Sequence, residues 1–132
     1  MKVIIAGSRT FHDYQLLETK VDNILQNQDD IEIISGTAKG ADQLGERYSK
    51  QRGYKLTKFP APWHDTNNKP FGEVKVNKRG KQYWTRAGAQ RNQWMADYAD
   101  ALIAFWEDES TGTKDMIQRA EKAGLKVRVI KV

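Results

Sequence analysis

The chain has 132 residues, of which 39% are hydrophobic and 30% charged, and it contains no cysteine. These values are typical of one soluble globular domain, and the lack of cysteine excludes a disulfide framework and a thiolate metal site. The short apolar run from Val3 to Ala6 is followed by polar residues. It is too short for a signal peptide or a membrane span, so a cytoplasmic protein without membrane contact is expected.

The net charge of +5 is concentrated in one segment of the chain. Between Asp65 and Arg91 there are seven basic and two acidic residues, a local balance of +5, so the rest of the chain sums to zero. A local excess of positive charge predicts either an anionic partner near this segment or simply a well-solvated loop.

Strand and helix patterns alternate along the first 59 residues. The predicted elements are a strand from Lys2 to Ala6, a helix over Tyr14–Leu25 with Asp13 as N-cap, a strand over Ile31–Ile34, a helix from Ala41 that Gly53 closes, and a strand over Tyr54–Phe59. The helices are assigned from apolar residues at intervals of three and four, and the strands from β-branched or alternating runs.

The alternation resumes after a long polar stretch that runs from Pro60 to about Arg86. A third helix, which Arg91 and Asn92 are expected to open, places Met95 and Tyr98 on one face. The remaining elements are a charge-free strand over Ala101–Trp106, a helix holding Met116, Ile117, Ala120 and Ala123 before Gly124, and a final strand in which Val127 and Val129 alternate with charged residues.

Repeated strand–helix units predict an α/β fold with a parallel sheet. The first and fourth strands are continuous apolar runs and should be central, whereas the third and fifth contain charges and should be edges. The order 3-2-1-4-5 follows, in a single Rossmann-like three-layer domain over residues 1–132. Ligands of such sheets bind at the carboxyl ends of the strands, where the strand order reverses between strands one and four.

Residues 65–86 interrupt this rhythm as a basic insertion. Val74 to Val76 and Lys81 to Trp84 are short extended pieces on either side of a turn that contains Gly80, which predicts a protruding hairpin. A loop of this length in a small domain is usually functional or disordered.

Three loops that follow predicted strands are rich in glycine and hydroxyl residues. Glycine lets backbone amides approach a phosphate closely, and a helix N-terminus favours an anion. Ordinary strand-to-helix turns have the same composition, but three such loops on one side of a sheet favour a ligand site. The candidate ligand residues in these loops are Gly7, Ser8, Arg9 and Thr10; Ser35, Gly36, Thr37, Lys39, Gly40 and Asp42; and Ser110, Thr111, Gly112 and Thr113.

Further candidates lie near these loops. Arg9 and Arg91 have the planar donors that suit a phosphate, although either could be a surface ion pair. Asn92 follows Arg91, and Asp42 could accept a hydrogen bond from a ribose hydroxyl or simply face the dipole of its helix. Trp106, at the end of a strand, could stack on a base or belong to the core. No Walker A loop or dinucleotide fingerprint is present, and neither a metal nor a cofactor is predicted.

These residues also resemble the YspA/YpsA-related branch of the SLOG superfamily over nearly the whole chain. The resemblance is carried by Val3 to Phe11, Ser35 to Asp42, Phe59 to Trp63, Arg91-Asn92 with Met95, Ala99 to Trp106, and Ser110 to Thr113 followed by Met116-Ile117. It implies a Rossmann-like domain that binds a nucleotide or its derivative. The superfamily includes phosphoribohydrolases that activate cytokinins, a DNA-processing protein that binds single strands, and sensors of ADP-ribose-type signals in bacterial and phage conflict.

Two departures from the family pattern matter. The hydrolase branch has a catalytic glutamate three residues after its last Gly-Thr pair, where this chain has Met116, with Asp115 one residue early. One residue is a rotation of about 100 degrees on a helix, so Asp115 should not replace that glutamate. The stretch from about Thr66 to Arg86 also looks longer than the equivalent family loop.

The leading hypothesis is therefore a binding protein for an ADP-ribose-like or cyclic nucleotide ligand, acting as a sensor or by sequestration, without turnover. The alternatives are a nucleoside-monophosphate phosphoribohydrolase and a single-stranded nucleic-acid binder. A nucleic-acid partner would contact the basic residues Lys75, Lys78, Arg79 and Lys81, with Tyr83 and Trp84 as stacking residues. Because no effector domain is evident, a homo-oligomer, a dimer or a tetramer, is also expected.

Overall fold

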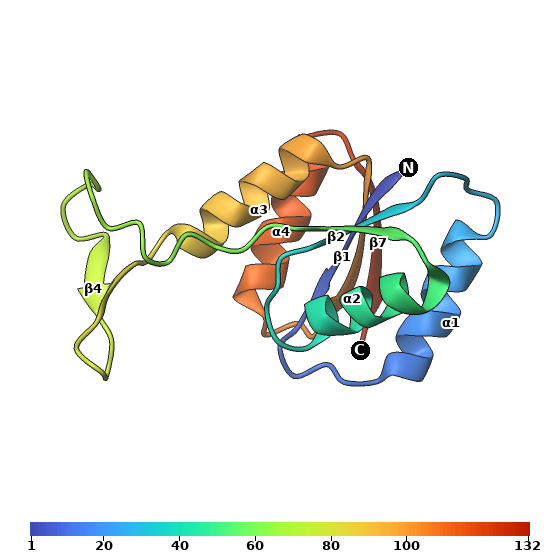
Figure 1. Ribbon diagram of the computed structural model, residues 1–132, viewed down its shortest axis with the longest axis horizontal. Helices are drawn as coiled ribbons and strands as arrows, with labels where there is room; N and C mark the ends of the chain where they lie inside the picture. Colours follow the sequence, from blue (N-terminus) through green and yellow to red (C-terminus); the bar gives the residue numbers. More distant parts are fainter.

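The computed structural model describes residues 1–132 and has a five-stranded parallel sheet at its centre (Figure 1). The strand order is β3-β2-β1-β6-β7, and every neighbouring pair is parallel. The strands are β1 (Lys2–Gly7), β2 (Glu32–Ser35), β3 (Lys55–Lys58), β6 (Ala101–Trp106) and β7 (Lys126–Lys131). Apart from the two hairpin strands β4 and β5, this is the predicted order, with the reversal between β1 and β6.

Two helices cover each face of the sheet and give the fold three layers. Helices α1 (Tyr14–Leu25) and α2 (Ala41–Arg52) pack on one face, and α3 (Ala87–Tyr98) and α4 (Thr111–Lys122) on the other. One buried cluster joins residues such as Leu17 and Tyr48 to Ile5, and a second joins Met95 and Met116 to Ile4. Successive residues of β1 thus face opposite cores, as the period of two in a strand requires.

Local signals set several helix boundaries. The Asp13 side chain accepts a hydrogen bond from the Leu16 amide at 3.1 Å and caps α1 as predicted. Gly53 ends α2 in the left-handed conformation, at φ +69°, where its amide bonds to the carbonyl of Lys50. Ser110 caps α4 through its hydroxyl. The ends of these helices are therefore encoded locally.

The edges of the sheet follow the charge pattern. β1 and β6 are buried almost throughout, whereas both ends of β3 and all of β7 except Val127 and Ile130 are exposed. Val127 packs on the core, but Val129 is exposed, and Ile130 instead contacts the opposite core cluster. No helix is both long and apolar enough to cross a membrane.

A separate hairpin stands clear of the body at the left of Figure 1. Its strands β4 (Val74–Val76) and β5 (Gln82–Trp84) are antiparallel and pair only with each other. The Asn77 amide donates to the Lys81 carbonyl, and Gly80 adopts φ +78° in the turn between them. We call residues 65–86 the arm.

Candidate functional site

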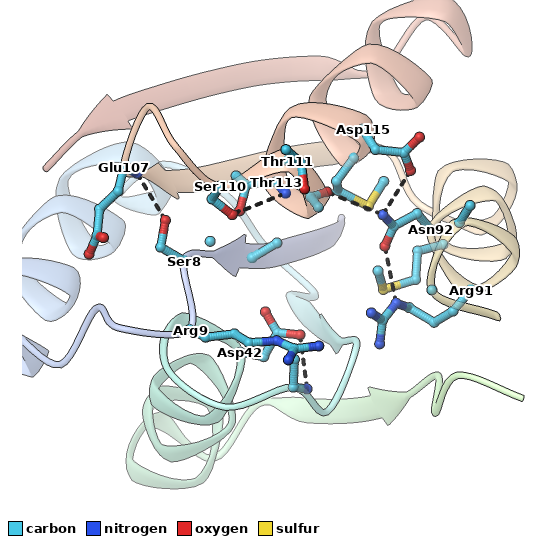
Figure 2. Close-up of a pocket in the computed structure, with 18 of the residues that line it drawn as sticks. Ser8, Arg9, Asp42, Arg91, Asn92, Glu107, Ser110, Thr111, Thr113 and Asp115 are labelled. Carbon is cyan, nitrogen blue, oxygen red and sulfur yellow. Dashed lines mark hydrogen bonds between the residues drawn. The ribbon is translucent and has the colours of Figure 1, made fainter. Parts of the chain in front are cut away.

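A cleft of about 690 Å³ lies beyond the carboxyl ends of β1 and β6, where the strand order reverses (Figure 2). Residues from the β1–α1 loop, from α2, α3 and the start of α4, and from the base of the arm form its walls. Many of the candidate residues meet here. Those that line the cleft are Gly7, Ser8, Arg9, Thr10, Asp42, Arg91, Asn92, Ser110, Thr111, Gly112 and Thr113.

The β1–α1 loop is held tightly against its neighbours. A Cβ atom at Gly7 would lie 2.2 Å from the Phe105 carbonyl oxygen, so only glycine fits between β1 and β6. The Ser8 hydroxyl accepts a hydrogen bond from the Glu107 amide at 2.9 Å, and the Ser8 carbonyl accepts from Phe11 and Ala41. Ser8 is buried, and its polar atoms position the loops around the cleft.

The N-terminus of α4 faces the cleft and presents free donors. The Ser110 hydroxyl accepts from the Thr113 amide at 3.4 Å and shares a hydrogen bond of 2.8 Å with the Thr113 hydroxyl. The amides of Thr111 and Gly112, in the same turn, have no partner in the protein. Free amides at a helix N-terminus, together with the helix dipole, favour an anion.

Arg91 and Asn92 enter the cleft from α3, but they do not open that helix. The helix begins four residues earlier, at Ala87, because the small residues from 87 to 89 are compatible with a helical turn, so the predicted start was wrong. The Arg91 side chain donates to the Gly36 carbonyl and, through Nε, to Asn92 Oδ1 at 3.0 Å. Burial lowers the pKa of Arg91, which the nearby carboxylate of Asp42 opposes.

Asp42 is a buried carboxylate at the floor of the cleft, with a side chain only 5% exposed. Its Oδ2 accepts from the Ala38 amide at 3.2 Å, and its Oδ1 accepts no hydrogen bond from the protein. Burial raises the pKa of Asp42 to about 6, although the Ala38 amide, Arg91 and Arg9 pull it down. Figure 2 shows Arg9 beside it. The cleft thus combines a free carboxylate oxygen with two guanidinium groups.

Six candidate residues lie outside the cleft lining: Ser35, Gly36, Thr37, Lys39, Gly40 and Trp106. The buried Ser35 hydroxyl is used within the protein, donating to Glu46 Oε2 at 2.6 Å and accepting from the Thr37 amide. A Cβ at Gly40 would lie 2.3 Å from the Ser8 carbonyl oxygen, so this glycine permits the close approach of two loops. Lys39 is exposed, and the Trp106 indole donates to the Ser110 carbonyl at 3.1 Å.

Sequence reasoning missed the acidic side of the cleft. Glu107 and Glu109 line it, as does Asp115, so four carboxylates including Asp42 face two arginines, and no lysine is present. Glu107 accepts from the Thr10 hydroxyl at 2.6 Å. The run from Glu107 to Glu109 directly after an apolar strand was the signal that could have revealed it.

Asp115 also lines the cleft, but its carboxylate already accepts hydrogen bonds from neighbouring side chains of the protein. Oδ2 accepts from Asn92 Nδ2 at 3.0 Å and from Arg119 Nε at 2.9 Å. The neighbouring Met116 is buried, and it belongs to the core on the α3–α4 face. Trp63 and Thr85, from the base of the arm, complete the lining on that side.

The fold and the position of the cleft define a Rossmann-like α/β protein with its candidate site at the point where strand order reverses. Residues 1–65 match the model of the YspA, cpYpsA-related SLOG family. The N-terminal half of the chain is therefore similar to a family of the SLOG superfamily. The chain is also 27% identical over 135 residues to the Gene 61 protein of Mycobacterium phage D29, covering 96% of this chain and 93% of that protein.

Two solved structures share the fold. DNA processing protein A (DprA) from Streptococcus pneumoniae superposes with a TM-score of 0.69 and 23% identity over 97% of this chain, which spans 49% of the DprA chain. The protein TM1055 superposes with a TM-score of 0.61 and 17% identity over 96% of this chain and 71% of that one. These similarities establish the Rossmann-like architecture.

Proposed function

We propose that the chain binds a nucleotide-derived ligand, ADP-ribose-like or a cyclic nucleotide, as a sensor or sequestering protein without turnover. The observation that supports this most is the meeting, in one cleft, of unpartnered helix amides, two guanidinium groups and a buried carboxylate with a free oxygen. A volume of about 690 Å³ is in the range of small-molecule pockets.

Each part of such a ligand has a matching group. A phosphate would accept hydrogen bonds from the amides of Thr111 and Gly112, and Arg9 and Arg91 would neutralise its charge. A ribose hydroxyl would donate to Oδ1 of Asp42, which accepts no hydrogen bond from the protein and faces the cleft. Together the phosphate and hydroxyl contacts fit a phosphorylated ribose, the part that all nucleotide-derived ligands share.

Binding without turnover is supported by the residues at and beside the position of the hydrolase glutamate. Cleavage of an N-glycosidic bond benefits from a carboxylate beside the developing positive charge. Here Asp115 Oδ2 already accepts two hydrogen bonds from the protein, and Met116, at the glutamate position, is a buried apolar side chain. A phosphoribohydrolase remains the alternative. It would release free base from nucleoside monophosphates, and the release would be lost in the Asp115→Asn variant.

The test is calorimetric titration with ADP-ribose and a panel of cyclic and linear nucleotides, using the wild type and three variants. Arg9→Ala and Arg91→Ala should each weaken binding by ten- to a hundredfold, since a hydrogen bond to a charged group contributes about 1.5–3 kcal/mol. Arg128→Ala removes an exposed arginine of β7 that does not line the cleft and should leave the affinity unchanged. No binding of any nucleotide at millimolar concentration would refute the proposal.

A further inference from the structure

The arm has an excess of unpaired positive charge and an uncovered apolar surface. Its two acids are both engaged, Asp65 with the Lys69 ammonium at 3.0 Å and Glu73 with the Trp84 indole at 3.1 Å. Phe71 is fully exposed, and Val76 is largely exposed. Five cations have no ion-pair partner: Lys75, Lys78, Arg79, Lys81 and Arg86.

A few contacts, some within the arm and some with Trp63 at its base, hold the arm in shape. The Trp84 amide donates to the Trp63 carbonyl, the Thr85 amide to the Glu73 carbonyl, and the rings of Trp63 and Tyr83 meet edge to face. A two-stranded sheet on its own is marginally stable in water, so a partner that covers it would stabilise it. Figure 1 shows the arm extending away from the body, so its surface is open to such a partner.

The cleft has the opposite character. Its rim contains Glu107 and Glu109, which form no ion pair, and its four carboxylates outnumber its two arginines. For an anionic ligand the cleft of one copy is therefore short of positive charge. The arm leaves the body on the α3 side of the cleft, where Trp63 lies against Gly88, and Figure 1 shows it extending away from the body.

A two-fold axis would resolve this mismatch. A two-fold axis makes contacts reciprocal, so if the arm of one copy lies over the cleft of the other, the second arm lies over the first cleft in the same way. We propose that two copies of the chain exchange arms, and that the cations of each arm lie over the acidic rim of the other copy's cleft and complete a site for an anionic ligand. The identity of the ligand rests on the proposed function. The contact between the two copies is proposed independently of that function.

A second copy fits the arm better than a nucleic acid does. A nucleic-acid backbone would satisfy the cations but would leave the exposed Val76 uncovered. The second copy provides unpaired carboxylates of complementary charge. An extended apolar surface on a monomer is also a common mark of a protein contact.

The first experiment measures mass by light scattering at low and high salt. The wild type should be a dimer that weakens at high salt, and reversing four arm charges (Lys75→Glu, Lys78→Glu, Arg79→Glu and Lys81→Glu) should give a folded monomer. The matched control makes the same change in net charge at exposed lysines of the body: Lys20→Glu, Lys50→Glu, Lys122→Glu and Lys126→Glu. The control should remain a dimer. A monomeric wild type, or a dimer that survives the arm reversal, would overturn the proposal.

The second experiment mixes defective copies. The arm-reversed protein keeps an intact cleft, and Arg91→Ala keeps an intact arm, so each alone should bind ADP-ribose weakly. Mixed dimers should regain up to about half of the wild-type binding capacity, because one of their two sites is complete. No recovery, alongside tight binding by the wild type, would contradict arm exchange and leave the proposed function intact.

Two further outcomes separate the hypotheses. A wild type that binds no nucleotide refutes the proposed function, and light scattering then still decides arm exchange. A monomeric wild type that binds an oligo-dT strand, with binding lost on arm reversal, would overturn arm exchange and identify the arm as a nucleic-acid surface.

Discussion

The body and the arm of this protein use similar residues in opposite ways. In the body, Phe105 of β6 is completely buried and stacks on Phe11 at 5.1 Å between ring centroids. In the arm, Phe71 is fully exposed. The body therefore stabilises itself by burying apolar surface, whereas the arm leaves such surface available. The fold and the proposed contact between copies therefore depend on separate sets of residues.

The loops around the cleft resemble the rest of the body, because close contacts within the protein fix their conformation. Their backbones are set by close contacts such as those of Gly7 and Gly40, and their polar atoms by Ser8 and Ser35. The turn of the arm is open by comparison, since nothing lies within 4 Å of a Cβ at Gly80. Three matched pairs of substitutions test this contrast.

The largest expected effect is on the buried phenylalanine. Phe105→Ala should lower the free energy of unfolding by about 3–5 kcal/mol, because it leaves a cavity between β6 and Phe11. Phe71→Ala should change it by less than about 0.5 kcal/mol. Urea unfolding followed by circular dichroism measures both. A large loss in Phe71→Ala would show that the arm packs on the body in solution.

The second pair compares two glycines of similar backbone conformation. Gly40 has φ +81° and Gly80 has φ +78°. Gly40→Ala should cost about 2–4 kcal/mol, because its Cβ would meet the carbonyl oxygens of both Ser8 and Arg9. Gly80→Ala meets no atom, and it should cost no more than about 1 kcal/mol from the left-handed backbone alone. Thermal denaturation measures both variants, and equal losses of stability in Gly40→Ala and Gly80→Ala would argue against the close contact between the two loops.

The third pair compares two acidic residues, and substitution of the first, Asp42, is expected to stabilise the folded state. The pKa of Asp42 is raised from 3.8 to about 6, so its ionised form is disfavoured by up to about 3 kcal/mol at neutral pH. Asp42→Asn should therefore raise the free energy of unfolding by about 1–3 kcal/mol at pH 7 while weakening nucleotide binding roughly tenfold. Asp65→Asn, in the exposed ion pair of the arm, should change stability by less than about 1 kcal/mol.

The pH dependence gives an independent check of Asp42. Between roughly pH 4 and 6 the folded state binds more protons at this site than the unfolded chain, so stability falls as pH rises through that window and then levels off. Arg91 from α3, Arg9 from the β1–α1 loop and Glu46 from α2 set the shift together with burial. The difference between the wild type and Asp42→Asn should show this fall, and a flat difference would contradict the buried carboxylate.

The arrangement of the strands and helices could be predicted from the order of the residues. The charge-free runs of β1 and β6 and the lysines in β3 and β7 were enough to order the sheet, because burial on one or both faces selects the residues of a strand. Caps such as Asp13 and Gly53, and the turn between the strands of the arm, were also readable, since their hydrogen bonds join residues close in sequence.

Which loop residues share the cleft depends on packing between distant parts of the chain and could not be predicted. Ser35 and Asp42 lie in the same glycine-rich loop region, yet packing commits the hydroxyl of Ser35 to Glu46 and leaves one oxygen of Asp42 free. The acidic rim and the setting of Arg91 against Gly36 likewise join residues far apart in the chain. Such contacts depend on the exact positions of the helices on the sheet. Those positions are set by the packing of the whole core, which cannot be read from local sequence patterns.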